Sequence, residues 1–421
     1  MKLFKSLLVA PAALGLLAPM SVTANEINLA EVSNYSSEGA VSDISIEKFD
    51  AAKEIAVTNS RVDTLEVQIN EFEAGSFSET TSLDGTVAFS VGAVDGSSTS
   101  LSEAVMASYS YTANLNTSFT GDDNLYVRIK TGNYADWMTS TTYGTYLVSA
   151  KGSPDTLGVD KIWYEFPVNE RNTVWVGPKI ENYYMHATSP SIYKPVTKQF
   201  TLGGNGAAYG ASTNSGVGWA YNADNGFAIS SNVVSKQNAT SNGFLTEQSQ
   251  TSWATQLGYT KPQYSASIIV NQKYNGWSDS YFSTATGKSR SGTGHTGNSS
   301  NIGLRSWWRP AESGTITPSI SFGYDVSDID GAASNASSTT AYFLGLNWTD
   351  MFQPDDRIGI ALGQPQKNES ETKDPFAWEA YYSFKVNDAI TVTPTAFGTT
   401  NRDNTAGNDV VGFVVDTTLK F

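Results

Sequence analysis

The chain has 421 residues, of which only 16% are charged, and its formal net charge is -15. A charge of that sign disfavours a nucleic-acid partner, and the lack of cysteine excludes disulfides and thiolate-bound metals. Beyond the N-terminus, no stretch approaches the ~20 consecutive apolar residues that a membrane-spanning helix requires.

The first 24 residues have the pattern of a secretory signal peptide. Lys2 and Lys5 give a positively charged start, residues 7–17 form a short apolar run, and residues 22–24 (VTA) form a small-residue cleavage site. We therefore expect export from the cytoplasm and a mature chain that begins at Asn25.

Residues 25–75 differ in composition from the rest of the mature chain and are expected to form a periplasmic segment with a short helix. Apolar or β-branched residues recur at heptad spacing, which is typical of a coiled coil. Three heptads are marginal for an isolated helix, so two interpretations stay open: a coiled coil between subunits, or an amphipathic helix packed beneath the C-terminal domain. The two heptad series are Ile55, Val62 and Ile69, and Thr58, Leu65 and Phe72.

From residue 76 to residue 421 the apolar pattern changes to a period of two. About sixteen short segments alternate in this way, and the gaps between them are alternately long and short. This arrangement is typical of a transmembrane β-barrel with long loops at one rim and tight turns at the other. The predicted strands are 79–93, 103–119, 123–132, 158–167, 172–182, 214–222, 225–235, 250–260, 263–274, 298–309, 314–325, 338–350, 355–366, 375–386, 389–400 and 409–421.

The last segment shows the two faces most clearly. One face carries apolar residues, and the other carries small or polar residues, as expected for a strand between lipid and water. An even number of strands, all antiparallel, also places the start of the first strand and the end of the last strand on the same side of the membrane. The apolar series is Val411, Phe413, Val415, Thr417, Leu419 and Phe421, and the opposite series is Gly412, Val414, Asp416, Thr418 and Lys420.

Charged residues in the other segments are assigned to the lumen. A charged side chain that faces lipid costs roughly 2–4 kcal/mol at the bilayer midplane, so these residues are expected to face water. An excess of Lys and Arg favours anions, although the acidic members leave the ion preference open, and the charges could simply keep the lumen wet. The predicted pore-lining residues are Arg128, Lys130, Lys161, Glu165, Lys179, Glu181, Arg305 and Asp416.

Aromatic residues gather near the ends of the predicted strands. Anchoring at the membrane interface is preferred for them over stacking on a ligand. They include Trp219, Tyr221, Trp253, Tyr259, Trp308, Tyr324, Trp348 and Tyr382.

The third long connection, residues 183–213, is the strongest candidate for a pore constriction. A loop of about 30 residues in a compact fold is usually functional, and it carries basic and aromatic side chains. The expected constriction residues are Tyr183, Tyr184, His186, Tyr193, Lys194 and Lys198.

Motifs for catalysis or cofactor binding are not found in the sequence. Residues 203–206 (GGNG) lack the Lys-Ser/Thr end of a phosphate-binding loop, and no His/Cys/Asp cluster suits a metal. His186 and His295 are the only imidazoles, and both lie in predicted loops. We therefore expect neither an enzyme nor a bound cofactor.

Three segments resemble the cyanobacterial outer-membrane porins of the OprB-like carbohydrate-selective superfamily, sometimes labelled iron uptake porins. They are residues 60–89 (SRVDTLEVQINEFEAGSFSETTSLDGTVAF), 176–185 (VGPKIENYYM), and the closing pair formed by 389–397 (AITVTPTAF) and the strand that ends at Phe421. The resemblance covers residues 60–421 and the signal peptide.

The resemblance implies a sixteen-stranded homotrimer in the outer membrane that allows passive diffusion of small hydrophilic solutes, such as ions, carbohydrates or iron species. It also implies that Phe421 is read by the barrel-assembly machinery. Many members carry an S-layer homology domain that binds the cell wall, but only about 35 residues separate Asn25 from the heptads. Peptidoglycan anchoring is therefore not expected.

Three functional classes fit the sequence. The leading interpretation is a porin for small hydrophilic solutes in the outer membrane of a Gram-negative cell. The alternatives are a plugged structural or adhesion barrel and a secreted β-rich binding protein that never meets lipid.

Overall fold

The computed structural model describes residues 76–78, 80–97, 101–141, 144–204, 207–210, 213–236, 243–277, 297–330 and 337–421. The expected signal peptide and heptad helix lie outside these residues, as does His295. In these parts of the chain, no helix has both the length and the apolar character needed to cross a membrane. A three-residue strand, β1 (Ser76–Ser78), begins the described part.

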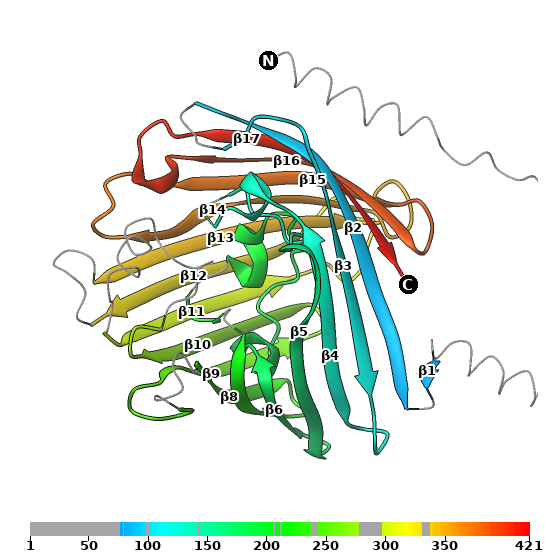
Figure 1. Cartoon of the computed structure of the whole chain (residues 1–421), viewed down its shortest axis with the longest axis vertical. Coiled ribbons are helices and arrows are strands. Elements are labelled where there is room, and N and C mark those ends of the chain that lie inside the picture. The colour runs from blue at the N-terminus through cyan, green and yellow to red at the C-terminus, as the bar shows by residue number, and fades with distance from the viewer. Residues whose placement is uncertain are drawn as a thin grey trace, which may run out of the picture. The chain divides into compact units, whose positions relative to one another are not determined.

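Within the described residues, the strands β2 to β17 form a closed antiparallel barrel of sixteen strands, which confirms the predicted fold class (Figure 1). Consecutive strands pair with each other, and β17 closes the ring on β2 from Val410–Gly96 to Lys420–Thr86. The strands are β2 (Thr81–Gly96), β3 (Met106–Thr117), β4 (Asn124–Asn133), β5 (Gly152–Asn169), β6 (Asn172–Ile180), β7 (Asn214–Asn222), β8 (Phe227–Lys236), β9 (Gln250–Lys261), β10 (Tyr264–Tyr274), β11 (Ser299–Trp308), β12 (Ser319–Ile329), β13 (Ser338–Thr349), β14 (Arg357–Asn368), β15 (Phe376–Lys385), β16 (Ile390–Thr400) and β17 (Val410–Lys420).

Most strand boundaries lie within three residues of the prediction. The exceptions are the start of β5 and both ends of β12, and the two starts differ for identifiable reasons. β5 begins at Gly152, earlier than predicted, because its N-terminal part continues to pair with the end of β4 across two register shifts. β12 begins at Ser319, later than predicted, directly after Pro318. Proline has no N–H to donate to a ladder and is therefore found at the start of a strand rather than inside it.

The two faces of the strands differ as the alternation requires. On β11, Ile302 and Leu304 are 40% and 44% exposed on the outer side, whereas Asn301 and Arg305 are only 2% and 3% exposed on the inner side. The outer surface is therefore apolar, and the polar and charged side chains of this strand point inward. This division suits a barrel with lipid outside and a polar interior.

Aromatic side chains cluster at the rim that carries the short turns. Tyr259 lies 4.7 Å from Phe227 and 6.2 Å from Tyr264, measured between ring centroids. At the same rim the Tyr382 hydroxyl donates to Asp356, which also accepts backbone N–H bonds from the turn between β13 and β14. An aromatic ring of this kind, apolar on one side and hydrogen-bonded on the other, fits a membrane interface.

Candidate functional site: the barrel lumen

The described part of the connection between β6 and β7, residues 181–204, 207–210 and 213, folds into the barrel interior. It contains two short 3-10 helices, η2 (Asn182–Met185) and η3 (Lys198–Gly203), which Figure 1 shows inside the ring of strands. Its first part is fixed to the inner faces of β8 and β9. Asn182 Nδ2 donates to Asn232 Oδ1 at 2.8 Å, and the Thr188 N–H donates to Gln256 Oε1 at 2.9 Å.

The middle of this loop, residues 193–197, is hydrogen-bonded to Glu379 of β15 on the opposite wall. The Tyr193 hydroxyl donates to Oε1 at 2.8 Å, and both the N–H and the hydroxyl of Thr197 donate to Oε2, at 2.7 and 2.6 Å. The Val196 N–H adds a fourth bond at 3.2 Å. Hydrogen bonds to a charged group are stronger than neutral ones, so this buried carboxylate ties residues 193–197 to the wall.

Further along the loop, Leu202 is bound by one member of a buried ion pair. Arg305 of β11 and Asp325 of β12 lie 2.8 Å apart, and both side chains are almost fully buried. Arg305 Nε also donates to the carbonyl of Leu202 at 2.8 Å. Leu202 has a positive φ of 53°, which is unfavourable for a residue with a side chain, so the bond holds a strained turn in place.

Glycines on the inner face allow the loop to lie directly on the wall. A Cβ added to Gly323 would overlap the carbonyl oxygen of Gly203, and one added to Gly258 would overlap the Thr188 side chain. The contact therefore requires the absence of a side chain. The inner glycines that meet the loop in this way are Gly218, Gly258, Gly303, Gly323 and Gly345.

The described part of a second loop, residues 134–141 and 144–151 between β4 and β5, also enters the lumen. The Val148 N–H donates to the Val196 carbonyl at 2.8 Å, and the Lys198 N–H donates to the Tyr146 carbonyl at 2.6 Å, so the two loops support each other. Trp137, fully buried, packs against Phe397 of β16 with ring centroids 5.7 Å apart. This part of the interior is apolar, which the sequence did not predict.

A basic cluster lies at the inner faces of β4 and β5 and in the two loops beside them. It is defined here as Arg128, Lys130, Lys151, Lys161 and Lys198 with the acidic residues Asp160 and Glu181. Lys161 Nζ lies 2.8 Å from Glu181 Oε2, and Lys151 Nζ lies 2.9 Å from Asp160 Oδ1. Arg128 donates to the Tyr184 hydroxyl at 3.2 Å. Five cations thus meet two carboxylates, which leaves an excess of positive charge at this wall.

The surroundings of the loop lower the pKa values of two of its side chains, Lys198 and His186. Burial, and then the proximity of Lys130, lowers the pKa of Lys198 to about 8. Burial lowers the pKa of His186 to about 3, so its imidazole is neutral at neutral pH. Lys198 therefore supplies a positive charge at neutral pH, and His186 does not.

Most of the predicted pore-lining residues are found on the inner side, but Lys179 is not. It pairs with Ile162, which points outward, because a bulge between Gly177 and Ile180 reverses the alternation. Lys179 Nζ instead donates to the Val159 carbonyl on the outer surface, so assigning it to the lumen was wrong. A long Lys stem can lie on apolar surface while its ammonium group reaches the polar rim.

The remaining predicted residues divide into water-facing and buried groups. Glu165 is half-buried on the inner side, in register with Trp175. Tyr183, Tyr184 and Tyr193 are buried or half-buried inside the loop, and Lys194 is exposed. Asp416 accepts hydrogen bonds from Ser90 and Ser149, the latter at 3.2 Å.

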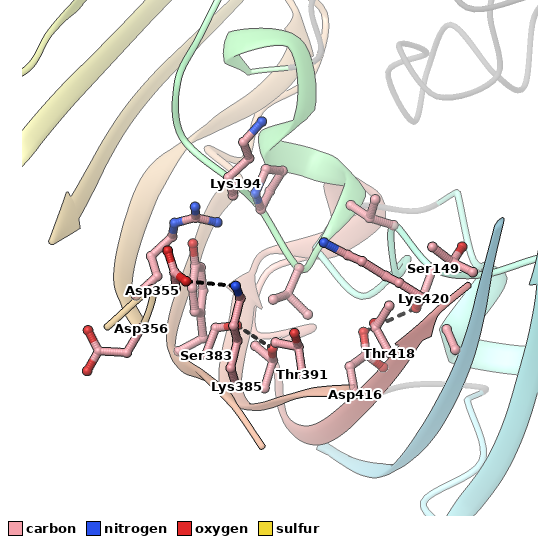
Figure 2. Close-up of a pocket in the computed structure, with 18 of the residues that line it drawn as sticks. Ser149, Lys194, Asp355, Asp356, Ser383, Lys385, Thr391, Asp416, Thr418 and Lys420 are labelled. Carbon is pink, nitrogen blue, oxygen red and sulfur yellow. Dashed lines mark hydrogen bonds and ion pairs between the residues drawn. The ribbon is translucent and has the colours of Figure 1, made fainter. Parts of the chain in front are cut away.

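An open cavity of about 710 Å³ lies in the half of the lumen that the long loop leaves uncovered (Figure 2). It is lined by the inner faces of β2–β4 and β14–β17, by the end of β13 and its turn to β14, and by two loop segments, Val148–Ser149 and Lys194–Val196. Both basic and acidic side chains reach it. The charged residues that line it are Lys130, Lys194, Asp350, Asp355, Asp356, Arg357, Lys385, Asp416 and Lys420.

Several residues that shape this interior were missed by sequence reasoning. Glu379 and Asp325 lie on strands whose inner faces could have been assigned by alternation. The glycine positions and Trp137 carry no comparable signal. Among the described residues, no group of three or more His, Cys, Asp or Glu side chains is placed to hold a metal ion.

Comparison with known proteins gives a consistent picture. An uncharacterised protein, alr4550, of Nostoc sp. (strain PCC 7120) is 26% identical over 89% of this chain and 71% of its own length. Pseudomonas putida OprB has the same fold, with a TM-score of 0.57 at 12% identity over 80% of this chain and 94% of that one. The trimer form of Vibrio cholerae OmpT gives a TM-score of 0.51 at 11% identity over 81% and 99%.

The family description "Carbohydrate-selective porin, OprB family" matches residues 57–421, and with it the whole barrel. The predicted family resemblance is thereby confirmed. The closed barrel and the family together establish a channel rather than an enzyme, located in the outer membrane of a Gram-negative cell. This chain is a member of the OprB family of carbohydrate-selective porins and forms an outer-membrane pore for small solutes.

Proposed function

We propose that the barrel is a passive diffusion channel for small hydrophilic solutes that favours anions over cations. The observation that carries this proposal is the basic cluster, in which five cations face two carboxylates beside the loop that narrows the lumen. Lys and Arg at a constriction lower the energy of an anion and raise that of a cation. The negative charge of the whole chain does not decide selectivity, because ions in the pore respond to the nearest groups.

The predicted lumen residues take different parts in this proposal. Arg128, Lys130 and Lys161 form the basic wall, and Lys194 and Lys198 bring positive charge from the loop. Glu181 and Asp416 are engaged by Lys161 and by two serines, respectively, which limits their attraction for passing cations. Arg305 is paired with Asp325 and buried beneath the loop, so its role is to position the loop and not to face the solute.

The test is the reversal potential of the purified protein in a planar bilayer under a KCl gradient. We expect discrete conductance steps and a chloride-to-potassium permeability ratio above one. Replacing both Lys194 and Lys198 by Glu should lower that ratio. The matched control is Arg171→Glu, which changes charge at an exposed turn between β5 and β6. An unchanged ratio in the loop variant would remove the loop from the selectivity argument.

We also propose that the protein assembles as a homotrimer, by analogy with the trimer form of Vibrio cholerae OmpT. Phe421 is proposed as the signal read by the barrel-assembly machinery. The residue is 52% exposed, its ring stacks on Tyr111 with centroids 5.8 Å apart, and its backbone bonds Gly85 at 2.9 and 3.2 Å. An exposed terminal ring held at the end of the last strand is accessible to a partner that closes the barrel.

A barrel without transport is a second candidate, and the apolar packing of the two loops inside the lumen favours it. Liposome swelling separates the two candidates. Vesicles that contain the folded protein should swell in arabinose or glucose if the pathway is open. Failure to swell, together with absence of conductance steps from protein shown to be folded, would support the plugged barrel.

A further inference from the structure

We propose that the cavity at the short-turn end of the lumen is a binding site for polyhydroxylated anions, that is, sugar-like solutes with a phosphate or carboxylate group. This inference rests on the proposed diffusion function and specifies the class of solute. The volume of about 710 Å³ lies within the roughly 300–1,000 Å³ that is usual for small-molecule sites.

The basic side chains in this cavity are available to a solute. Lys130, Lys194, Arg357 and Lys420 all line it. Among the described residues, none of these four has a carboxylate within 4.0 Å of its basic group. Lys194 and Lys420 are exposed, and the other two are half-buried. Four cations without an ion-pair partner, arranged around one cavity, form a site that an anion would complete.

The acidic side chains that line the same cavity are already engaged. Asp355 is paired with Lys385 at 2.7 Å, on one side of the cavity in Figure 2. Asp356 accepts N–H bonds from Met351 and Phe352 at 2.8 and 2.9 Å, and Figure 2 shows its carboxylate pointing away from the cavity.

The other two carboxylates are engaged by hydrogen bonds. Asp350 accepts the N–H of Asp355 at 2.6 Å. Asp416 accepts the hydroxyls of Ser90 and Ser149. The repulsion of an entering anion is therefore smaller than the number of carboxylates suggests, because each is hydrogen-bonded or ion-paired.

The loop and the wall bring two of the cations close together. The Lys194 N–H donates to Asn347 Oδ1 at 3.3 Å, Asn347 Nδ2 donates to the Tyr381 hydroxyl at 2.9 Å, and Arg357 hydrogen-bonds the same hydroxyl. Burial, and then repulsion from Arg357, lowers the pKa of Lys194. The network places residue 194 near Arg357, and the repulsion between their two positive charges is relieved when an anion binds near them.

Hydroxyl groups in the cavity are suited to bind the sugar part of such a solute. Four of the eight cavity-lining residues on β15, β16 and β17 are Ser or Thr, whose hydroxyls both donate and accept hydrogen bonds. Such groups match the hydroxyls of a sugar, whereas the Arg and Lys groups match a phosphate or carboxylate. The hydroxyl-bearing residues that line the whole cavity are Thr86, Ser110, Thr112, Ser149, Thr349, Ser383, Thr391, Thr393 and Thr418, with the phenol of Tyr381.

The experiment is single-channel recording of the full protein in KCl, with glucose 6-phosphate added in increasing concentration. We expect concentration-dependent interruptions of the current, and an apparent Kd at least about tenfold lower than that for glucose or inorganic phosphate. The double variant Lys194→Gln/Arg357→Gln should raise the apparent Kd for glucose 6-phosphate by at least about tenfold. The matched control, Arg171→Gln, removes a charge at the same rim but outside the cavity and should leave it unchanged.

The possible failures can be told apart. Conductance steps in KCl without interruption by glucose 6-phosphate would overturn this inference and leave the diffusion channel standing. Equal effects of inorganic phosphate would reduce the site to an anion site, and equal effects of glucose would contradict the role of the cations. An unchanged Kd in the double variant would also overturn it. Lack of any conductance from folded protein would instead contradict the proposed function itself.

Discussion

The hydroxyl of Tyr193 donates a hydrogen bond to the carboxylate of Glu379 at 2.8 Å, although the two residues are 186 positions apart. This bond joins the middle of the long inner loop to β15, on the wall opposite β6 and β7, the two strands that the loop connects. Because Glu379 is fully buried and accepts three further bonds from Val196 and Thr197, it is the main polar anchor of this part of the loop.

Replacing Glu379 by Gln tests this anchor. The amide has one acceptor oxygen and places a donor where Thr197 also donates, so at least one buried bond is lost. We expect a loss of about 1–3 kcal/mol in unfolding free energy and increased open-channel current noise. The measurements are the temperature at which the folded gel band disappears and the noise of single-channel records. Glu369→Gln, at an exposed loop, is the control and should change neither.

Gly323→Ala tests whether the loop lies directly on the wall. The new methyl group would overlap the carbonyl oxygen of Gly203, and because this oxygen belongs to the loop backbone, the loop itself must shift. We expect the free energy of unfolding to fall by about 1–3 kcal/mol, as at other overpacked sites, and the unitary conductance to change. The folded gel band should then disappear at a lower temperature. The control is Gly158→Ala in β5, where an added Cβ meets nothing within 4 Å. Equal behaviour of the two variants would contradict direct packing.

The ion preference should depend on pH through Lys198. Its pKa is lowered to about 8, so the side chain loses its positive charge as the pH rises through 8, and the chloride-to-potassium permeability ratio should fall between pH 7 and 9. The unfolded chain keeps the lysine charged up to about pH 10.4. Below about pH 8 both states are charged, and between about pH 8 and 10 the unfolded state binds more protons, so this group adds stability as the pH rises.

The variant Lys198→Arg separates this effect from other titrations. Arginine stays charged throughout the range, so the fall in permeability ratio between pH 7 and 9 should become smaller. Reversal potentials at pH 6, 7, 8 and 9 in both proteins measure the difference. If the two pH profiles coincide, Lys198 does not face the ion pathway.

The barrel was predictable because its physical constraint repeats along the whole chain. Each strand that contacts lipid must alternate, so sixteen weak patterns gave the strand number and most boundaries. The inner loop was also predictable in outline, since its length and its Lys and Tyr content stand out. The details of the interior were not, because they depend on pairings between distant residues such as Tyr193 with Glu379 or Leu202 with Arg305.

Single irregularities also defeat the alternation rule. Lys179 was assigned to the lumen by counting in twos from Trp175, but the bulge before Ile180 adds one residue and moves the lysine outside. The entry of residues 134–141 and 144–151 into the lumen had no sequence signal, because a buried Trp137 in a loop looks the same as an interfacial one. The packing partner, Phe397, is known only from the fold.

The buried pair of Arg305 and Asp325 gives the last prediction. Removing one partner leaves a charge in an environment without water, whereas removing both leaves none. We expect Asp325→Asn to lower the unfolding free energy by about 3–5 kcal/mol and the double variant Arg305→Met/Asp325→Leu to lower it by less. The measurement is urea-induced unfolding in detergent micelles, monitored by tryptophan fluorescence. In Asp325→Asn, Arg305 loses the carboxylate that positions it, and in the double variant the Leu202 carbonyl loses its donor altogether. Both changes weaken the hold on the turn at Leu202, so we expect a more mobile loop and more open-channel noise. Additive losses in the double variant would show that the two side chains do not act as a pair.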